Sequence, residues 1–185
     1  MRKLFLPFAA LACLLAVPAL AQLQIDITKP IVTAVEQGKA DQVRLMLLRG
    51  ESPNTVDQRG WSILITATAY GQAGVAEVLL KAGALTEVVD EFGNTPLLRA
   101  ADHDDIALAE VLLKYKAKVN AQNKQGTTAL MIAARRGATD LIDLLIRYKA
   151  DVNKADYTGR TALAFARQNR KQAAMRMLEK AGGTE

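Results

Sequence analysis

The amino-acid sequence predicts an all-α solenoid of about five stacked repeats. Two observations support this: several residue types recur every 33 positions, and each period holds two short apolar segments separated by turn residues. The recurring glycines are Gly60, Gly93, Gly126 and Gly159. The polar residues three positions earlier are Asp57, Asp90, Asn123 and Asp156. The recurring leucines are Leu64, Leu97, Leu130 and Leu163. Because independent columns share one spacing, we expect each unit to bury its apolar face against the next.

The third period shows how each unit begins a helix. The Thr95 hydroxyl is placed to accept hydrogen bonds from the first free backbone N–H groups, and Pro96 suits the first helical position. Gly93 permits the positive φ that a tight turn before the helix requires. The capping hydroxyl recurs in the other periods, at Ser62, Thr128 and Thr161.

A 33-residue period with a Thr-Pro-Leu core resembles the ankyrin repeat, and the resemblance covers about residues 24–183. It implies two antiparallel helices and a protruding β-hairpin loop in each unit. The implied repeats are about 24–56, 57–89, 90–122, 123–155 and 156–185, within one repeat domain over 22–185. The family usually places a histidine after the leucine. Here Ile65, Leu98, Met131 and Ala164 stand there, so we expect apolar contacts to replace its hydrogen bonds.

The first 21 residues have the pattern of a cleavable signal peptide. Arg2 and Lys3 precede an apolar run from Leu4 to Val17, and Ala19-Leu20-Ala21 forms an A-x-A cleavage site. We expect the mature chain to begin at Gln22 and to reside in the periplasm or to be secreted. An uncleaved anchor and a lipid on Cys13 are the alternatives.

The repeats differ along the chain. Trp61-Ser62-Ile63-Leu64 replaces the Thr-Pro-Leu pattern in the second repeat. In the third repeat, Asp104 and Lys116 stand at positions after the helices where the second repeat has glycine, and the fourth repeat has glycine again at Gly137. The basic, polar end of the fifth repeat is interpreted as the solvent-facing surface that a terminal repeat needs.

The residue inventory disfavours catalysis. His103 is the only histidine, and Cys13, the only cysteine, lies in the predicted signal. The run Asp102-His103-Asp104-Asp105 resembles a metal cluster, but it sits at a predicted helix end without the further histidines that such a site needs. No phosphate-binding glycine loop is present. We therefore expect no enzyme activity, no metal and no cofactor, with a carboxylate-dependent hydrolase as an unfavoured alternative.

Charge divides unevenly between the two ends. Residues 22–122 carry a net charge of −3, and residues 123–185 carry +6. Such a dipolar solenoid can orient its encounter with a partner, but the overall balance is too mild to indicate nucleic-acid binding.

The resemblance places a binding surface on the concave face, formed by hairpin tips and first helices. Trp, Tyr and Arg, the residue types most enriched in interface hot spots, gather at these positions. Trp61 and Phe92 have the alternative role of packing against neighbouring hairpins. Tyr70, His103 and Arg136 occupy the same position in successive repeats. Because this row ends on Arg135 and Arg136, in the basic part of the chain, we expect the partner to be acidic where it meets the fourth repeat. The candidate binding residues are Arg59, Trp61, Tyr70, Phe92, His103, Arg135, Arg136, Tyr157 and Arg160.

The sequence thus predicts a monomeric, non-catalytic module that binds another protein, without a stable membrane anchor after signal cleavage. The resemblance to short exported bacterial ankyrin-repeat proteins implies a partner in the periplasm, in some cases a haem catalase. The rival hypothesis is a secreted effector or inhibitor of another cell's protein. Fold alone does not decide between them.

Overall fold

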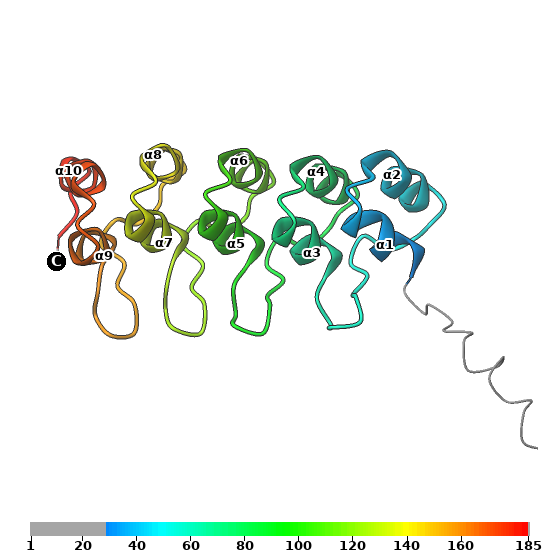
Figure 1. Cartoon of the computed structure of the whole chain (residues 1–185), viewed down its shortest axis with the longest axis horizontal. Coiled ribbons are helices and arrows are strands. Elements are labelled where there is room, and N and C mark those ends of the chain that lie inside the picture. The colour runs from blue at the N-terminus through cyan, green and yellow to red at the C-terminus, as the bar shows by residue number, and fades with distance from the viewer. Residues whose placement is uncertain (1–28, 185) are drawn as a thin grey trace, which may run out of the picture.

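The helices lie in two parallel rows along the solenoid axis. A computed structural model describes residues 29–184, so the predicted signal peptide and the start of the first repeat lie outside the described residues. The odd-numbered helices form the row from which the hairpin loops project, and the even-numbered helices form the outer row (Figure 1). Within residues 29–184 the helices are α1 (Pro30–Glu36), α2 (Ala40–Leu48), α3 (Ile63–Ala69), α4 (Ala73–Lys81), α5 (Pro96–His103), α6 (Ile106–Lys114), α7 (Ala129–Arg136), α8 (Thr139–Arg147), α9 (Ala162–Gln168) and α10 (Gln172–Lys180). The predicted all-α repeat solenoid is confirmed.

The predicted helix starts are also confirmed. The hydroxyl of Thr95 accepts a hydrogen bond from the backbone N–H of Leu98 at 3.4 Å, and Pro96 occupies the first helical position. Ser62, Thr128 and Thr161 cap α3, α7 and α9 in the same way. One hydroxyl therefore satisfies a free donor at the start of four inner helices.

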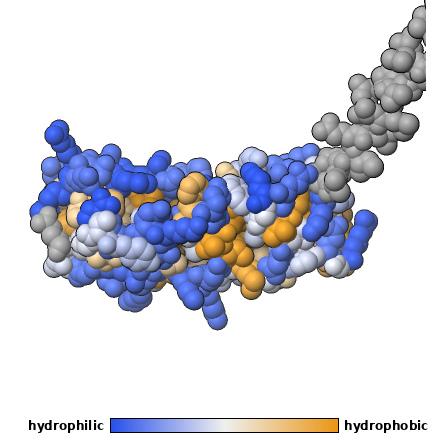
Figure 2. Space-filling model, turned by 90° about the horizontal axis from the view of Figure 1, so that it is seen from below, coloured by the Kyte–Doolittle hydropathy of each residue, from blue (hydrophilic) through white to orange (hydrophobic). Residues whose placement is uncertain are grey.

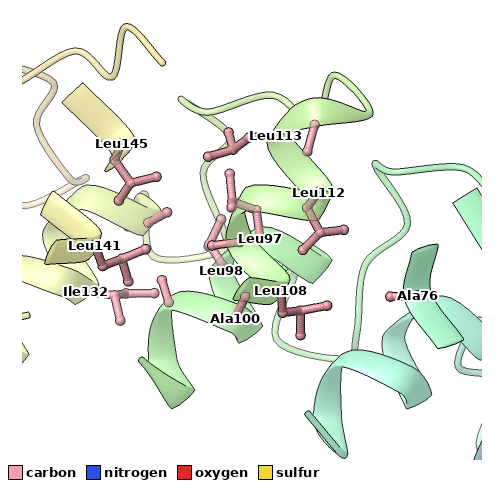
Figure 3. Close-up of a cluster of buried hydrophobic side chains, with 14 of the residues drawn as sticks. Ala76, Leu97, Leu98, Ala100, Leu108, Leu112, Leu113, Ile132, Leu141 and Leu145 are labelled. Carbon is pink, nitrogen blue, oxygen red and sulfur yellow. The ribbon is translucent and has the colours of Figure 1, made fainter. Parts of the chain in front are cut away.

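The hydrophobic core runs without a break from one repeat to the next. Figure 3 shows part of it, where leucines of α5 and α6 meet Ala76 of α4 on one side and Leu141 of α8 on the other. Small side chains let the inner helices pack closely: Ala67, Ala100, Ala133 and Ala166 are fully buried. Stability is therefore shared between neighbouring repeats.

Apolar side chains fill the places where the family's histidine would stand. Ile65, Leu98 and Met131 are all buried. The Met131 sulfur also lies 3.4 Å from the backbone N–H of the capping residue Thr128. Packing thus takes over at these positions, as expected from their apolar side chains.

A second column of polar side chains links each repeat to the next. Side-chain oxygens of Asn54, Glu87, Asn120 and Asn153 accept hydrogen bonds from the backbone N–H groups of Leu85, Lys118, Asp151 and Thr184, at 2.7–2.9 Å. Each of these bonds spans 31 residues, so the repeated series sets the spacing of the hairpin bases.

The two departures from glycine in the third repeat do not change the backbone. Asp104 ends α5 at φ 55°, and Lys116 follows α6 at φ 64°, both in the left-handed region. That conformation costs a side chain about 1 kcal/mol or more relative to glycine. The third repeat therefore keeps the turn geometry of its neighbours despite a less favourable residue.

Because Leu130 is buried in the column of repeated leucines, its truncation should strongly destabilise the fold. We expect Leu130→Ala to lower the free energy of unfolding by ~2–5 kcal/mol through lost burial and a residual cavity. Denaturant titration followed by circular dichroism measures this value.

Leu48→Ala is the matched control, since Leu48 ends α2 with 78% of its surface exposed. Its effect should stay within ~0.5 kcal/mol. Equal losses for both leucines would contradict the assigned repeat phase.

Candidate protein-binding face

Each hairpin loop is closed by one Asp or Asn side chain at its start, and the three aspartates are buried while Asn123 is half-buried. In the third repeat an Asp90 oxygen accepts hydrogen bonds from the backbone N–H groups of Phe92 and Asn94, both at 2.8 Å. Asp57, Asn123 and Asp156 bind their own hairpins in the same pattern, at 2.8–3.0 Å. These bonds fix the tip residues, where the sequence places much of the candidate surface.

The second carboxylate oxygen binds an arginine in three of the four hairpins. Arg59 contacts Asp57 at 2.7 Å, Arg99 contacts Asp90 at 2.6 Å, and Arg160 contacts Asp156 at 2.8 Å. The three carboxylates are at most 3% exposed. Arg59 and Arg160, predicted as binding residues, therefore also hold the hairpins, while almost half of each arginine side chain stays exposed.

These contacts keep the buried carboxylates ionised. Burial raises the pKa of Asp156, but hydrogen bonds from Arg160 and Thr158 outweigh it and bring the pKa down to about 2. Burial also raises the pKa of Asp57, but the hydrogen bonds that Asp57 accepts from Arg59 and Trp61 outweigh this effect and lower the pKa. The pKa of Asp90 is lowered against the same opposing effect by the backbone and side chain of Asn94. A general acid needs a raised pKa, so these three carboxylates do not suit the general-acid role in a carboxylate-dependent hydrolase.

Trp61 packs against two guanidinium groups. Its ring centroid lies 4.2 Å from the Arg59 guanidinium carbon and 5.1 Å from that of Arg99. The indole N–H donates to Glu91 of the next hairpin at 2.6 Å. The packing contacts considered for Trp61 are present, and its contact with a partner stays a prediction. Phe92 instead exposes 54% of its surface.

Arg135 and Arg136 are not isolated cations. Asp102, one repeat earlier, lies 3.2 Å from Arg135 and 3.9 Å from Arg136. The pairing was not predicted, because Asp102 and Arg135 are 33 residues apart and meet only when adjacent repeats stack.

A groove of about 380 Å³ crosses the third, fourth and fifth repeats between the hairpins and the inner helices. We call it the arginine groove. Three of the predicted residues, Phe92, Arg135 and Arg160, lie on it. Its apolar surface comes from Leu98, Ile132, Phe165 and Phe92, and its charged side chains are Arg99, Arg135, Arg160 and Asp102.

The other predicted residues are spread along the molecule. Tyr70 and His103 line one hollow of about 570 Å³ at the ends of α3 and α5, so the structure brings this pair together. Tyr157 is 72% exposed at the last hairpin. A Cβ added at Gly126 would lie 2.6 Å from the Tyr157 nitrogen, so glycine allows these two hairpins to touch.

Several exposed apolar residues were not predicted from the sequence. Val56, Leu85 and Val89 lie in the loops after α2 and α4, and with Phe92 they form what we call the hairpin patch. Each is 47–61% exposed. Figure 2, seen from the hairpin side, shows apolar residues gathered over these two hairpins. Val56 and Val89 share one column, where later repeats carry Gln122 and Ala155; this difference was the available signal.

Within residues 29–184 no three His, Cys, Asp or Glu side chains cluster as metal ligands would. No helix among these residues is long and apolar enough to cross a membrane.

The comparison with known families agrees with this architecture. A model of ankyrin repeats, in three copies, matches residues 31–123 and again residues 116–184. The matches span most of the chain, and the chain belongs to the ankyrin-repeat family. Proteins of this class mediate interactions between proteins and are generally non-catalytic. A comparison with curated proteins finds none that matches this chain.

The lowered pKa of Asp156 predicts a loss of stability in acid. A group with a pKa of about 2 in the folded chain and an ordinary value of 3.8 stabilises the fold above pH 4, and loses this effect as the pH falls towards 2. Asp156→Asn keeps an acceptor for the hairpin, as Asn123 does naturally, but removes the charge. The advantage of the wild type over this variant should therefore mostly vanish between pH 5 and pH 2.5, measured by urea unfolding.

Asp156→Ala separates the two effects, because it removes the acceptor as well as the charge. It should be less stable than Asp156→Asn throughout this pH range. A wild-type advantage over Asp156→Asn that does not change with pH would contradict the ion-pair account.

Proposed function

We propose that this chain is an exported bacterial protein-binding module without catalytic activity of its own, and that its partner contacts the hairpin patch and the adjoining arginine groove. The observation that carries the proposal is the exposure of four large apolar side chains on two neighbouring hairpins. Contiguous exposed apolar surface on a small protein is typical of an interaction site.

The position of the patch supports the same interpretation. Phe92 belongs both to the hairpin patch and to the lining of the arginine groove, so the two surfaces are continuous. An apolar centre with polar and charged groups around it is the usual composition of a protein interface. The hairpins are also held rigid by their buried carboxylates, which reduces the entropy lost on binding.

The proposed location rests on the N-terminal sequence. Residues 1–21 have the charge, apolar run and cleavage pattern of a signal peptide, which supports a periplasmic or secreted protein. In the periplasm, the role we favour is support of a resident enzyme. The alternative, an effector that acts on another cell's protein, requires the chain in the culture medium, and immunoblotting of medium and periplasm separates the two.

The hairpin patch should control partner capture. We expect Val89→Gln combined with Phe92→Gln to reduce the partner recovered by cross-linking in the periplasm at least tenfold, because the apolar contacts are lost. Both residues are more than half exposed, so the unfolding midpoint should hardly change. Quantitative mass spectrometry of the cross-linked products measures the capture.

Leu48→Gln is the matched control, since Leu48 is an exposed apolar residue outside the hairpins. It should capture the partner as the wild type does. Unchanged capture by the double variant would remove the main support for the proposed surface.

The proposed export makes a separate prediction. Protein purified from its native host should have an intact mass that begins at Gln22, because the Ala19-Leu20-Ala21 site directs cleavage there. A retained Met1, or the added mass of a lipid on Cys13, would contradict it.

A further inference from the structure

We propose that the arginine groove binds an extended acidic segment of the partner, and that Asp102 occupies the place of a partner carboxylate until the segment binds. This inference rests on the proposed function and names the chemistry of the partner at one part of the binding face.

Two cations of the groove are held in place before any partner arrives. The Arg99 Nε donates to Asp90 at 2.6 Å, and Nε and Nη2 of Arg160 donate to Asp156 at 3.0 and 2.8 Å. Each guanidinium carries five N–H donors, so both retain donors that these carboxylates do not use. Preorganised guanidinium groups are well suited to carboxylate recognition, since less side-chain entropy is lost on binding.

The surroundings of these cations strengthen a charged contact. Leu98 and Ile132 are buried beside them, and the Arg160 guanidinium carbon lies 4.5 Å from the ring centroid of Phe165. An apolar surrounding lowers the effective dielectric constant, so a hydrogen bond from either guanidinium to a partner carboxylate is stronger here than on an open surface. Asp90 and Asp156 already balance the charges of these two arginines, so the unbalanced positive charge beside the groove comes from Arg135 and Arg136, which share Asp102.

The length of the groove indicates a segment rather than a single small ion. Its lining comes from α5, α7 and α9 and from the three hairpins beside them. Its polar wall includes the side chains of Asn94, Gln125 and Thr127, which can hydrogen-bond to a peptide. A ligand that contacts both Arg99 and Arg160 must therefore extend across three repeats.

Asp102 is the one carboxylate on the groove lining, and it contacts two arginines. It lies 3.2 Å from Arg135 and 3.9 Å from Arg136, and its side chain is 48% exposed. Two cations share one anion at this point, which leaves a net positive charge. Exposed ion pairs of this kind are weak. A partner carboxylate can therefore take over the contact with Arg135 at small cost.

The molecule offers a matched pair for the test on its outer row. Arg147 and Asp143 of α8 form an ion pair at 3.0 Å and are exposed to a similar degree, away from the groove. Asp143→Asn changes the net charge by the same amount as Asp102→Asn. Any difference between the two variants thus reports the position of the charge and not its total.

The experiment is a fluorescence anisotropy titration of the mature chain. The probe is a labelled 12-residue peptide with Glu at alternate positions and Ser or Leu between them, together with a twin that has Gln for Glu. We expect Asp102→Asn to tighten binding of the Glu peptide 3- to 10-fold and Arg135→Gln to weaken it by a similar factor. Asp143→Asn and Arg147→Gln should stay within twofold of the wild type. Added salt should weaken binding, since it screens the charges.

Three outcomes would overturn the inference: equal tightening by Asp102→Asn and Asp143→Asn, equal binding of the Gln twin, or tighter binding of an oligothymidylate of equal charge. If any of these occurs while the hairpin-patch variants still lose their cross-linked partner, the proposed function stands and the acidic segment is wrong. If the patch variants still capture the partner and Arg135→Gln still binds the peptide as the wild type does, both the proposed function and the acidic segment are wrong.

Discussion

The rest of the structure depends on the hydrogen bonds that one Asp or Asn side chain accepts at the start of each hairpin. An aspartate or asparagine accepts two backbone N–H groups of its own loop, and this contact recurs in four successive repeats. Without this acceptor the two backbone N–H groups would lose the hydrogen bonds that hold the loop. The contact thus determines the direction of each hairpin, and the hairpins in turn determine the shape of the binding face.

The same carboxylates connect stability with binding. Asp90 and Asp156 lower the freedom of Arg99 and Arg160, which line the arginine groove. In the fourth repeat the acceptor is Asn123, whose amide donates to Asn94 of the previous hairpin at 2.9 Å instead of neutralising an arginine. Asn123 carries no charge, and the arginines of this repeat, Arg135 and Arg136, instead contact the exposed carboxylate of Asp102. The Asp and Asn side chains that stabilise the hairpins therefore also determine where charge lies on the concave face.

Much of the fold could be predicted because its causes are local and repeated. Each helix start depends on residues only a few positions apart: a hydroxyl before the helix, a proline at its first position or a glycine in the preceding turn. These signals recur from repeat to repeat. The site was less accessible. Trp61 was considered for packing or for binding, and its contact with the guanidinium group of Arg99 became evident only from the structure, because Arg99 belongs to the next repeat. Val56 and Val89 were not predicted, because they directly precede the hairpin aspartates, whereas the candidate positions follow them.

The sequence by itself determined the period, the helix starts, the buried leucine and alanine columns, and the family to which the chain belongs. Only the tertiary structure decided which cation meets which carboxylate, and which apolar side chains stay exposed. Asp102 and Arg135 are one full repeat apart in the chain, and their contact exists because stacking places equal positions of adjacent repeats side by side. A periodic pattern specifies each repeat, whereas the surface that a partner meets is formed between repeats.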